Sequence, residues 1–228
     1  MKLSIIVPTF NSEKRIEKLI ERIIKVKLGN IEKEIIVIDD SSKDQTLQKL
    51  KKIKNIILIS HKKNTGKGGA IGSGLKKATG DILFIQDDDF EYDPDEIPQI
   101  IKPILREKAE LVFGSRRLNK KNKYSSLTYY WGGVFLDNIF SLILRTRISD
   151  SLTGSKAFTR KFYNILKPIE TKGFEIEAEI TAKAVRNGII PFEIPITYSP
   201  RTHKQGKNIR WHHAFPVIKA LIKFSYFS

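Results

Sequence analysis

Hydrophobic residues in the first half of the chain follow two periods in alternation. Residues 3–7 and 82–85 are short apolar runs, which predict buried strands. Between them, apolar residues from Ile16 to Ile24 recur at the spacing of one helix face, which predicts an amphipathic helix within residues 13–28. The same criteria predict strands at 34–38, 56–59 and 111–113 and helices at 46–53, 66–78 and 94–106. This order predicts an α/β fold in which helices flank both faces of a mostly parallel sheet, as an α/β/α sandwich.

The second half of the chain loses this regular alternation. Helices are predicted at 128–144, 175–186 and 211–227, and strands at 156–158 and 189–198. Pro191 and Pro195 lie in the last of these strands, and because proline cannot donate a ladder hydrogen bond, we expect that strand at a sheet edge. The chain contains neither an internal repeat nor a low-complexity linker. We therefore expect one domain over residues 1–210, followed by a basic amphipathic helix over residues 211–228 that suits a membrane interface.

A run of acids follows the predicted strand at 82–85. It consists of Asp87, Asp88 and Asp89, with Glu91 two places on. The carboxyl edge of a parallel sheet is where α/β proteins bind ligands. Three adjacent like charges repel, and this is explained if a divalent cation and a phosphate share the site, because Mg²⁺ and Mn²⁺ commonly bridge carboxylates to phosphates. The alternative is a solvated acidic turn.

Two further segments are expected at the same edge of the sheet. Asp39 and Asp40 end the strand at 34–38 and are suited to accept hydrogen bonds from a nucleobase or ribose; alternatively, Asp40 caps the following helix. Residues 64–69 look like a glycine-rich phosphate cradle. The loop is no P-loop, because Gly68 rather than Ser or Thr follows Lys67, and its glycine spacing differs from the dinucleotide fingerprint. It therefore disfavours a kinase, a GTPase or a dehydrogenase.

The charge balance narrows the class of partner. The 228 residues carry 41 Lys and Arg against 25 Asp and Glu, a formal net charge of +16. Such an excess favours a polyanionic partner: nucleic acid, an anionic membrane surface or a phosphorylated substrate. The chain has no cysteine, which excludes disulfides and thiolate metal sites. We expect neither a signal peptide nor a membrane span, since the most apolar stretch, residues 127–144, is interrupted by Asp137 and Asn138.

The order of several short motifs resembles that of inverting family 2 glycosyltransferases with a GT-A fold. In the first half these motifs are Pro8-Thr9-Phe10-Asn11 with Glu13, Ile38 to Ser42, Asn64 to Gly68, Gln86 to Asp89 and Gly114 to Arg117. In the second half, the motifs that resemble the dolichyl-phosphate mannose synthase branch are Gly173 to Glu177 with Glu179, Tyr198 to Thr202 and Gly206-Lys207. The resemblance spans residues 3–211, nearly the whole chain.

The resemblance implies roles for the matched residues. The nucleotide-sugar donor would contact Pro8, Phe10, Glu13, Asp39, Asp40, Lys67, Asp87 and Asp88. Mg²⁺ or Mn²⁺ would be held or surrounded by Asp87, Asp89 and Glu91, and the catalytic groups would be Asp89, Arg117, Arg201 and Lys207. Two positions depart from the family pattern: Phe10 stands where many relatives have tyrosine, and Glu91 stands where mannose synthases often have glutamine. These departures leave the donor sugar and the preferred metal open.

The resemblance also implies a reaction and a place. The reaction is transfer of a hexose from GDP-mannose or UDP-glucose to a polyprenyl phosphate. The place is the cytoplasmic face of a membrane, where the enzyme would be peripheral on the anionic surface, with room for a membrane partner protein. A phosphate acceptor needs no strong general base, whereas a sugar hydroxyl in glycan synthesis would need one, for which Asp150 and Glu175 are the candidates.

A function of a different class is a non-enzymatic nucleic-acid-binding protein, which the net charge of +16 would suit. No recognised nucleic-acid module appears in the sequence, and the acids gather in the predicted ligand crevice. We therefore expect no nucleic-acid partner.

Overall fold

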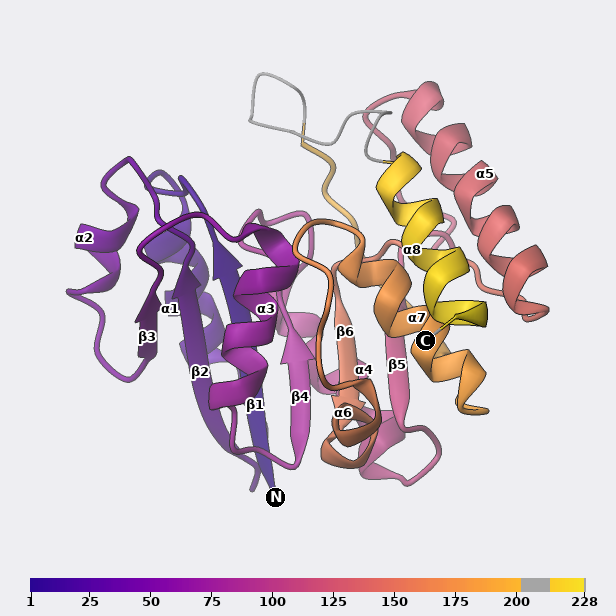
Figure 1. Cartoon of the computed structure of the whole chain (residues 1–228). Helices are drawn as coiled ribbons and strands as arrows, with labels where there is room; N and C mark the ends of the chain where they lie inside the picture. The colour runs from indigo at the N-terminus through magenta and orange to yellow at the C-terminus, as the bar shows by residue number, and fades with distance from the viewer. Residues whose placement is uncertain (202–213, 228) are drawn as a thin grey trace.

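Strands and helices alternate along most of the protein, and the helices cover both faces of a central sheet (Figure 1). The computed structural model describes residues 1–201 and 214–227. The strands are β1 (Lys2–Thr9), β2 (Glu32–Asp39), β3 (Ile57–Ser60), β4 (Ile82–Ile85), β5 (Leu111–Ser115), β6 (Lys156–Thr159) and β7 (Phe192–Pro195). The helices are α1 (Ile16–Lys25), α2 (Thr46–Leu50), α3 (Gly66–Lys77), α4 (Ile97–Leu105), α5 (Leu127–Leu144), α6 (Arg160–Leu166), α7 (Ile176–Arg186) and α8 (Ala214–Tyr226), with a 3₁₀ turn η1 (Pro94–Glu96) before α4.

The sheet has the strand order β3-β2-β1-β4-β6-β5-β7. β1 lies between β2 and β4 and is parallel to both, and β3 extends the parallel part. β6 is antiparallel to its neighbours β4 and β5, while β7 pairs with β5 in parallel. The predicted mostly parallel sheet is thus confirmed. β7 forms the edge, as expected from Pro191 and Pro195, and it is shorter than the predicted strand at 189–198.

The side-chain alternation of the strands divides the core between the two faces of the sheet. On β1, Ile6 packs in one cluster with residues of α3, α7 and α8, whereas Ile5 packs in the other with residues of α1 and α4. Both clusters consist mainly of Ile, Leu, Val, Phe and Ala side chains that are almost wholly removed from water. The two clusters are the physical basis of the three-layer architecture, because each face of the sheet needs a helical layer to bury it.

Helix α6 was not among the predicted elements. It follows β6 without a loop, and Thr159 caps it by accepting a hydrogen bond from the backbone N of Phe162 at 3.1 Å. The Arg160 side chain anchors its first turn by donating to the carbonyl of Gly80 at 2.7 Å and to that of Ala78 at 2.9 Å. Seven residues are too few for a helical period to stand out in the sequence, so only the long-range contacts reveal this helix.

The carboxyl-terminal helix α8 packs on the domain by one face. Val217, Leu221 and Phe224 are buried against the cluster that includes α7 residues, and Lys223 Nζ pairs with Glu170 at 2.6 Å. The predicted helix start at Trp211, and with it the predicted domain boundary, falls outside the described residues. The inner face of the helix therefore contributes buried apolar area to the core, irrespective of what contacts its outer face.

The first prediction concerns the contact between α3 and the sheet. A Cβ added at Gly74 would lie 2.5 Å from Ile6 Cγ2 and 2.7 Å from Ile38 Cδ1, whereas one added at Gly72 would lie 3.6 Å from Ile169 Cβ, an ordinary contact. We expect Gly74→Ala to lower the free energy of unfolding by about 1–2 kcal/mol, because overpacking exceeds the gain in helix propensity. Gly72→Ala, on the same helix, should leave stability unchanged or raise it by about 0.5–1 kcal/mol. Urea titrations of both variants measure the difference, and equal effects would contradict the packing argument.

Candidate active site

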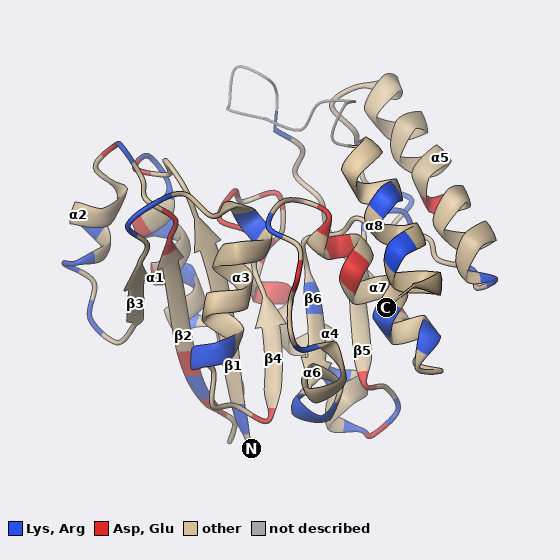
Figure 2. Ribbon diagram, in the orientation of Figure 1, with Lys and Arg blue, Asp and Glu red and all other residues tan. Residues whose placement is uncertain are grey.

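Acidic residues gather at the carboxyl ends of the central strands, beside the first turn of α3 (Figure 2). Asp87, Asp88 and Asp89 follow β4 after one residue, Gln86, as the sequence predicts. Each of the three carboxylates contacts a different element, so the run divides into three local environments. This division gives each carboxylate a different set of contacts.

Asp87 pairs with Lys67, the second residue of α3. Lys67 Nζ lies 2.8 Å from Asp87 Oδ1 and 2.9 Å from Glu177 Oε1 on α7. Burial alone would lower the pKa of Lys67, but the two carboxylates together raise it, so the ammonium stays charged. The predicted neighbourhood of Lys67 and Asp87 is therefore present in the structure.

Asp88 turns toward β1 and the start of α1. It accepts a hydrogen bond from Thr9 Oγ1 at 2.6 Å and another from Ser12 Oγ. Its backbone carbonyl accepts one from Arg15 Nε at 3.2 Å. Asp88 thus ties the acidic run to the β1–α1 turn, and this structural use of its carboxylate was not predicted.

Asp89 and Glu91 share Arg201. Arg201 Nη2 lies 2.7 Å from Asp89 Oδ2, and Arg201 Nε lies 3.4 Å from Glu91 Oε1. Tyr198 Oη donates to Glu91 Oε2 at 3.0 Å. Burial, together with the nearby charges of Asp87 and Glu91, raises the pKa of Asp89 to about 7 although Arg201 opposes the shift. Asp89 is therefore a carboxylate whose negative charge is only partly compensated.

This arrangement suits a divalent cation that is completed by phosphate oxygens. Among the described residues, no group of three or more acidic or histidine side chains is gathered closely enough to hold a metal alone. Mg²⁺ and Mn²⁺ sites of nucleotide enzymes commonly use one or two carboxylates plus substrate phosphates. Asp89, whose pKa is raised although Arg201 contacts it, fits that donor set. Asp87 contacts Lys67, and Glu91 contacts Arg201 and the hydroxyl of Tyr198.

The two acids that end β2 differ sharply from each other. Asp40 accepts hydrogen bonds from the backbone N of Thr65 at 2.9 Å and of Gly66 at 2.7 Å, and its Oδ1 lies 2.6 Å from His61 Nδ1. The expected capping of the helix near Thr46 by Asp40 is wrong: Asp44 accepts from Thr46 N at 2.9 Å, and Asp40 holds the start of α3 instead.

Asp39 Oδ1 is buried without a hydrogen-bond partner among the described residues. A buried acceptor of this kind is costly unless a ligand donor completes it. The orphaned oxygen therefore marks a position suited to a hydroxyl or N–H group of a ligand.

The remaining residues predicted to contact the nucleobase lie around the end of β1. Pro8 pairs in register with Ile38, and Phe10 is 42% exposed immediately beyond the Thr9–Asp39 pair. Glu13 accepts a hydrogen bond from the backbone N of Gln45 at 3.0 Å, so one of its oxygens joins the starts of α1 and α2. The exposed ring of Phe10 offers a stacking face beside the buried Asp39.

A second group of charges lies after β5. Arg116 forms a bidentate pair with the fully buried Asp150, through Nε at 2.7 Å and Nη2 at 2.6 Å. Arg117 pairs with Asp137 of α5 and donates to the carbonyl of Ser149 at 2.8 Å. Burial acts to raise the pKa of Asp150, but Arg116 and Arg117 hold it below its ordinary value. Asp150 is therefore a poor general base.

Arg117 also lines an open cavity of about 600 Å³ below the first turn of α5. The other lining residues are Asn119, Lys120, Asn122, Tyr124, Ser126, Leu127 and Tyr130. Arg117 Nε is buried and has no hydrogen-bond partner in the described part of the chain. Cations, amides and hydroxyls of this kind suit a phosphate group.

Three residues of functional interest were not singled out from the sequence. Lys156 and Asp137 are buried and charged, and Glu177 was noted only as part of a motif. No local signal distinguishes them from surface residues; only the tertiary structure brings them to the site.

Two other residues were predicted from the sequence. The side chain of Glu175 lies against Gly173 at the start of α7, and Lys207 lies outside the described residues.

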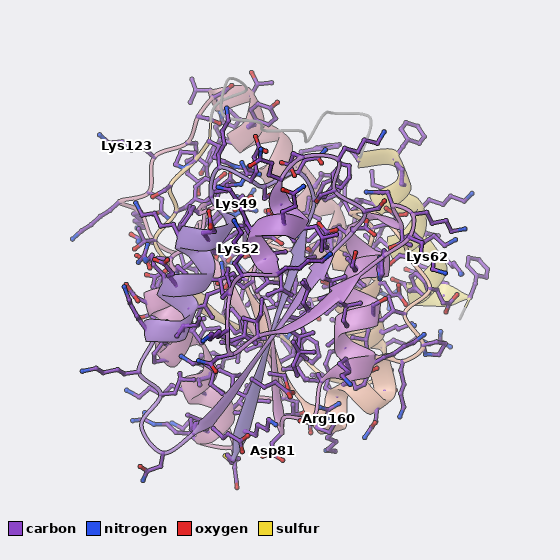
Figure 3. All side chains as sticks on the ribbon, turned by 90° about the vertical axis from the view of Figure 1, so that its left-hand side faces the viewer. Lys49, Lys52, Lys62, Asp81, Lys123 and Arg160 are labelled. Atoms are coloured by element: carbon purple, nitrogen blue, oxygen red, sulfur yellow. The ribbon has the colours of Figure 1, made fainter. Side chains whose placement is uncertain are left out.

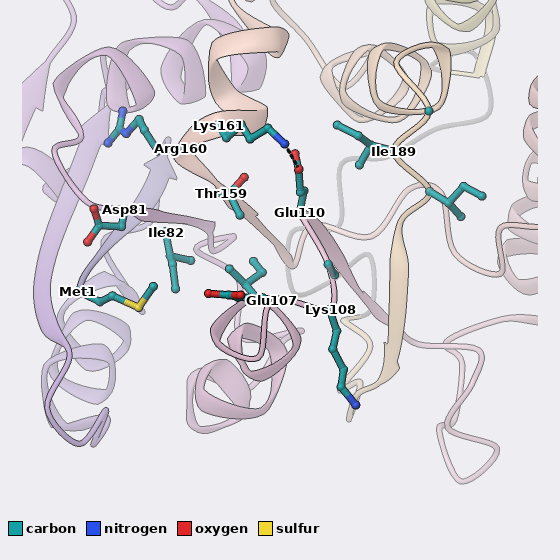
Figure 4. A pocket seen from close by; sticks show the side chains of 14 residues that line it. Met1, Asp81, Ile82, Glu107, Lys108, Glu110, Thr159, Arg160, Lys161 and Ile189 are labelled. Carbon is teal, nitrogen blue, oxygen red and sulfur yellow. Dashed lines mark hydrogen bonds and ion pairs between the residues drawn. The ribbon is translucent and has the colours of Figure 1, made fainter.

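A cavity of about 570 Å³ lies at the opposite end of the sheet, among Met1, Asp81, Glu107, Arg160 and Ile189 (Figure 4). The figure shows the Lys161–Glu110 pair at its rim; Lys161 Nζ lies 2.5 Å from Glu110 Oε1. Asp81 and Arg160 also mark this lower end in Figure 3, away from the upper end where the acidic strand ends lie. The cavity is thus separate from the candidate active site.

The labelled lysines in Figure 3 are spread over separate parts of the surface. Lys49 and Lys52 lie near α2, whereas Lys62 and Lys123 lie toward opposite sides of the view. Lys49 moreover pairs with Glu17 at 2.7 Å. A basic stripe of the kind that follows a nucleic-acid backbone is not formed by these four lysines.

Comparison with known proteins gives the chain its class. Residues 4–164 match the family described as glycosyl transferase family 2. The chain is 31% identical over 228 residues to UDP-N-acetylglucosamine–dolichyl-phosphate N-acetylglucosaminyltransferase from Methanococcus voltae, covering 90% of this chain and 89% of that protein. It is 30% identical to dolichol-phosphate mannosyltransferase from Pyrococcus furiosus, covering 91% of this chain and 59% of that protein.

Among solved structures, glucosyl-3-phosphoglycerate synthase from Mycobacterium tuberculosis, in complex with Mn²⁺, UDP and glucosyl-3-phosphoglycerate, has the same fold. Its TM-score is 0.73 at 20% identity, over 98% of this chain and 80% of that one. The GT-A fold expected from the sequence motifs is confirmed by this likeness.

The chain therefore belongs to glycosyl transferase family 2. It is a glycosyltransferase, and its relatives include dolichyl-phosphate sugar transferases.

The second prediction follows from the raised pKa of Asp89. Because the folded protein holds the Asp89 proton more tightly than an unfolded chain does, the ionised carboxylate destabilises the fold as pH rises from about 4 through about 7. We expect Asp89→Asn to raise the free energy of unfolding of the metal-free protein at pH 8 by roughly 1–3 kcal/mol, a gain that shrinks toward pH 5. Denaturant titrations across this range measure it.

Asp44→Asn serves as a control of opposite sign. Burial acts to raise the pKa of Asp44, but hydrogen bonds from Thr46 and Glu13 lower it on balance. That variant should lose stability at pH 8. A loss of stability in Asp89→Asn as well would contradict the picture of an undercompensated Asp89.

Proposed function

We propose that the protein transfers a sugar from a nucleotide-diphosphate donor to a polyprenyl phosphate with the help of Mg²⁺ or Mn²⁺. The observation that carries this proposal is the juxtaposition of two features: an acidic, undercompensated strand end, and a cationic cavity beneath an exposed apolar helix. The relatives from Methanococcus voltae and Pyrococcus furiosus, which are dolichyl-phosphate sugar transferases, support it. The donor sugar, GDP-mannose, UDP-glucose or another, is not fixed by these features.

On the donor side, Phe10 stacks on the nucleobase, and the orphaned oxygen of Asp39 accepts a hydrogen bond from the base or ribose. Lys67 faces the diphosphate. Asp89 would hold the metal ion, which would supply stabilisation of the negative charge that grows on the leaving group. Arg201, which pairs with Asp89 and Glu91 in the structure, would be available to the phosphates if a cation were held by these carboxylates.

On the acceptor side, the phosphate of the lipid binds in the cavity at Arg117. One of its oxygens attacks the anomeric carbon of the sugar, and the bond from that carbon to the donor diphosphate breaks, which inverts the configuration. The attacking oxygen is already anionic near neutral pH, so no side chain needs to remove a proton. The engagement of Asp150 by Arg116 agrees with such a reaction and disfavours a hydroxyl acceptor that would need Asp150 as its base.

The lipid tail and the membrane would meet the outer face of α5. Leu127, Trp131, Phe135 and Leu142 on this helix are 77%, 63%, 64% and 79% exposed. At 100° per residue they fall within a single narrow face. Phe215 and Tyr226 of the neighbouring α8 are also exposed on one face. Such a surface suits the interface of an anionic membrane.

Within the described residues, no helix is long and apolar enough to cross a bilayer. Binding in the interface plane is therefore the mode that the apolar faces of α5 and α8 support. The cytoplasmic face, and any membrane partner protein, remain part of this proposal.

The third prediction tests the acceptor site. Arg117→Ala should lower kcat/KM for transfer to a polyprenyl phosphate by about 10- to 100-fold, because a charge-assisted hydrogen bond to phosphate contributes about 1.5–3 kcal/mol. The affinity for UDP or GDP with Mn²⁺ should stay within about twofold, since that site lies at the strand ends. Arg117→Lys should restore only part of the transfer rate, because an ammonium group lacks the guanidinium fork.

Transfer is measured from UDP- and GDP-sugars with Mn²⁺ and again in excess chelator. Arg106→Ala, at an exposed position after α4, controls for loss of a positive charge and should transfer at the wild-type rate. Undiminished transfer in chelator would refute the metal requirement. Faster transfer to a sugar hydroxyl than to the lipid phosphate would refute the acceptor assignment.

The fourth prediction concerns the membrane. The double variant Trp131→Glu, Phe135→Glu should reduce flotation with vesicles of anionic lipid at least severalfold, because two carboxylates at the interface disfavour insertion. Its folding stability should change by less than about 1 kcal/mol, since both side chains are exposed. The control is Ile190→Glu, which adds a carboxylate at another apolar position, 64% exposed, near the opposite end of the sheet. Equal flotation of all three proteins would show that α5 is not the docking face.

A further inference from the structure

Four charged side chains form a continuous series from the candidate donor site into the core. They alternate in sign and come from four places: Asp87 after β4, Lys67 in α3, Glu177 in α7 and Lys156 in β6. Lys67 Nζ lies 2.8 Å from Asp87 Oδ1 and 2.9 Å from Glu177 Oε1. The other oxygen of Glu177, Oε2, pairs with Lys156 Nζ. The series thus ends on an ammonium group deep in the protein.

Lys156 is the member that the core does not explain. Its side chain is 0% exposed, and its Nζ contacts the backbone carbonyls of Ser151 and Thr153 and lies 4.6 Å from the ring centre of Phe113. A buried ion pair contributes little net stability, because desolvation offsets the attraction, and an apolar pair of similar volume often serves a core as well. A role in the neighbouring site accounts for a lysine at this position.

Glu177 lies between the two lysines, so the ammonium group of Lys67 is shared by two carboxylates, those of Asp87 and Glu177. If Glu177 were neutral, Lys67 would have Asp87 as its sole carboxylate and would neutralise it. If Lys156 were neutral, Glu177 would keep a full negative charge and draw Lys67 away from Asp87. The present arrangement lies between these extremes, so Asp87 retains part of its charge while Lys67 stays beside it.

We propose that Lys156 and Glu177 are positioning residues that hold the Lys67 ammonium at Asp87 and set how much of its charge Asp87 receives. The inference rests on the proposed function, because it takes Lys67 and Asp87 to border the donor diphosphate and the metal. Neither Lys156 nor Glu177 touches the reacting atoms; both act through Lys67. The pair adjusts the balance between affinity for the cation and affinity for the diphosphate.

The test uses the full chain and two single variants with opposite expected effects. Lys156→Met leaves the negative charge of Glu177 without its lysine partner, and this uncompensated charge should raise the affinity for Mn²⁺ alone. The affinity for UDP or GDP should fall, because Lys67 moves toward Glu177. In Glu177→Gln, Lys67 should neutralise Asp87 and lower the affinity for Mn²⁺ alone. Each change is expected to be about five- to tenfold. This is far below the roughly thousandfold effect of a unit charge at about 4 Å and an effective dielectric constant of about 20, because both residues act through Lys67. Calorimetric titration with Mn²⁺, then with UDP and GDP, measures both quantities without turnover.

Lys183→Met is the matched control on α7. Lys183 Nζ lies 2.7 Å from the buried Glu179 and donates to the carbonyls of Leu166 and Pro168, but its described contacts do not include Lys67. It should lose stability and keep the wild-type affinities. The double variant Lys156→Met, Glu177→Gln removes the buried pair without leaving a lone charge. It should regain stability, yet its Mn²⁺ affinity should stay as low as that of Glu177→Gln.

Shifts of Mn²⁺ affinity in the same direction in both single variants, or shifts no larger than that of Lys183→Met, would overturn the proposal. If Lys156→Met does not fold, the nearly isosteric Glu177→Gln and the double variant carry the test. A wild-type chain that binds neither UDP nor GDP in the presence of Mn²⁺ would overturn the proposed function itself. A wild-type chain that binds them while the variants behave like the control would overturn only the inference about Lys156 and Glu177.

Discussion

Three consecutive carboxylates at the end of β4 cannot all remain charged in a buried crevice unless each receives its own partner. The structure meets this constraint by taking the partners from separate elements: a lysine from α3, hydroxyls from the β1–α1 turn and an arginine after β7. Many of the contacts between sequence-distant residues in the crevice therefore pair these acids with cations or hydroxyl groups. Helix α3, the β1–α1 turn and the segment that ends at residue 201 are each joined to the acidic run by one of these contacts.

The same requirement makes the crevice responsive to ligands. Lys67 and Arg201 are counter-ions in the ligand-free chain, and both lie where phosphates would compete with the carboxylates for them. If Asp89 and its neighbours held a divalent cation, its positive charge would compensate the carboxylates, and Lys67 and Arg201 would be available to the phosphates. Metal and donor are thus expected to bind more tightly together than apart, because each relieves the charge that the other leaves unpaired.

The sequence predicted the sheet better than it predicted the network around it. Strands such as β1 and β4 are continuous apolar runs, and the rule that parallel strands end at one edge was enough to bring Asp39 and Asp87 together. The direction in which Asp88 turns was not predictable, because three identical residues in a row carry no local signal of their tertiary partners.

Helix α6 and the buried charges were missed for a related reason. Lys156 opens a short strand, and its four-residue pattern gives no reason to place an ammonium group in the core. Glu177 lies in the first turn of α7, where an acid is explained by the helix dipole alone. The environment of both residues depends on the position of β6, which lies antiparallel between β4 and β5. No local sequence pattern predicts this position.

Helix α5 combines the two kinds of surface that a charged lipid substrate requires. A polyprenyl phosphate needs cations for its head group and an apolar surface for its tail, and water separates these surfaces on most proteins. Here Asp137 faces inward from α5 and pairs with Arg117, while Trp131 and Phe135 on the same helix face outward. The helix therefore sets the depth of the cationic cavity relative to its own apolar face. Under the proposed function, a head group bound at Arg117 would have its tail leave along that face.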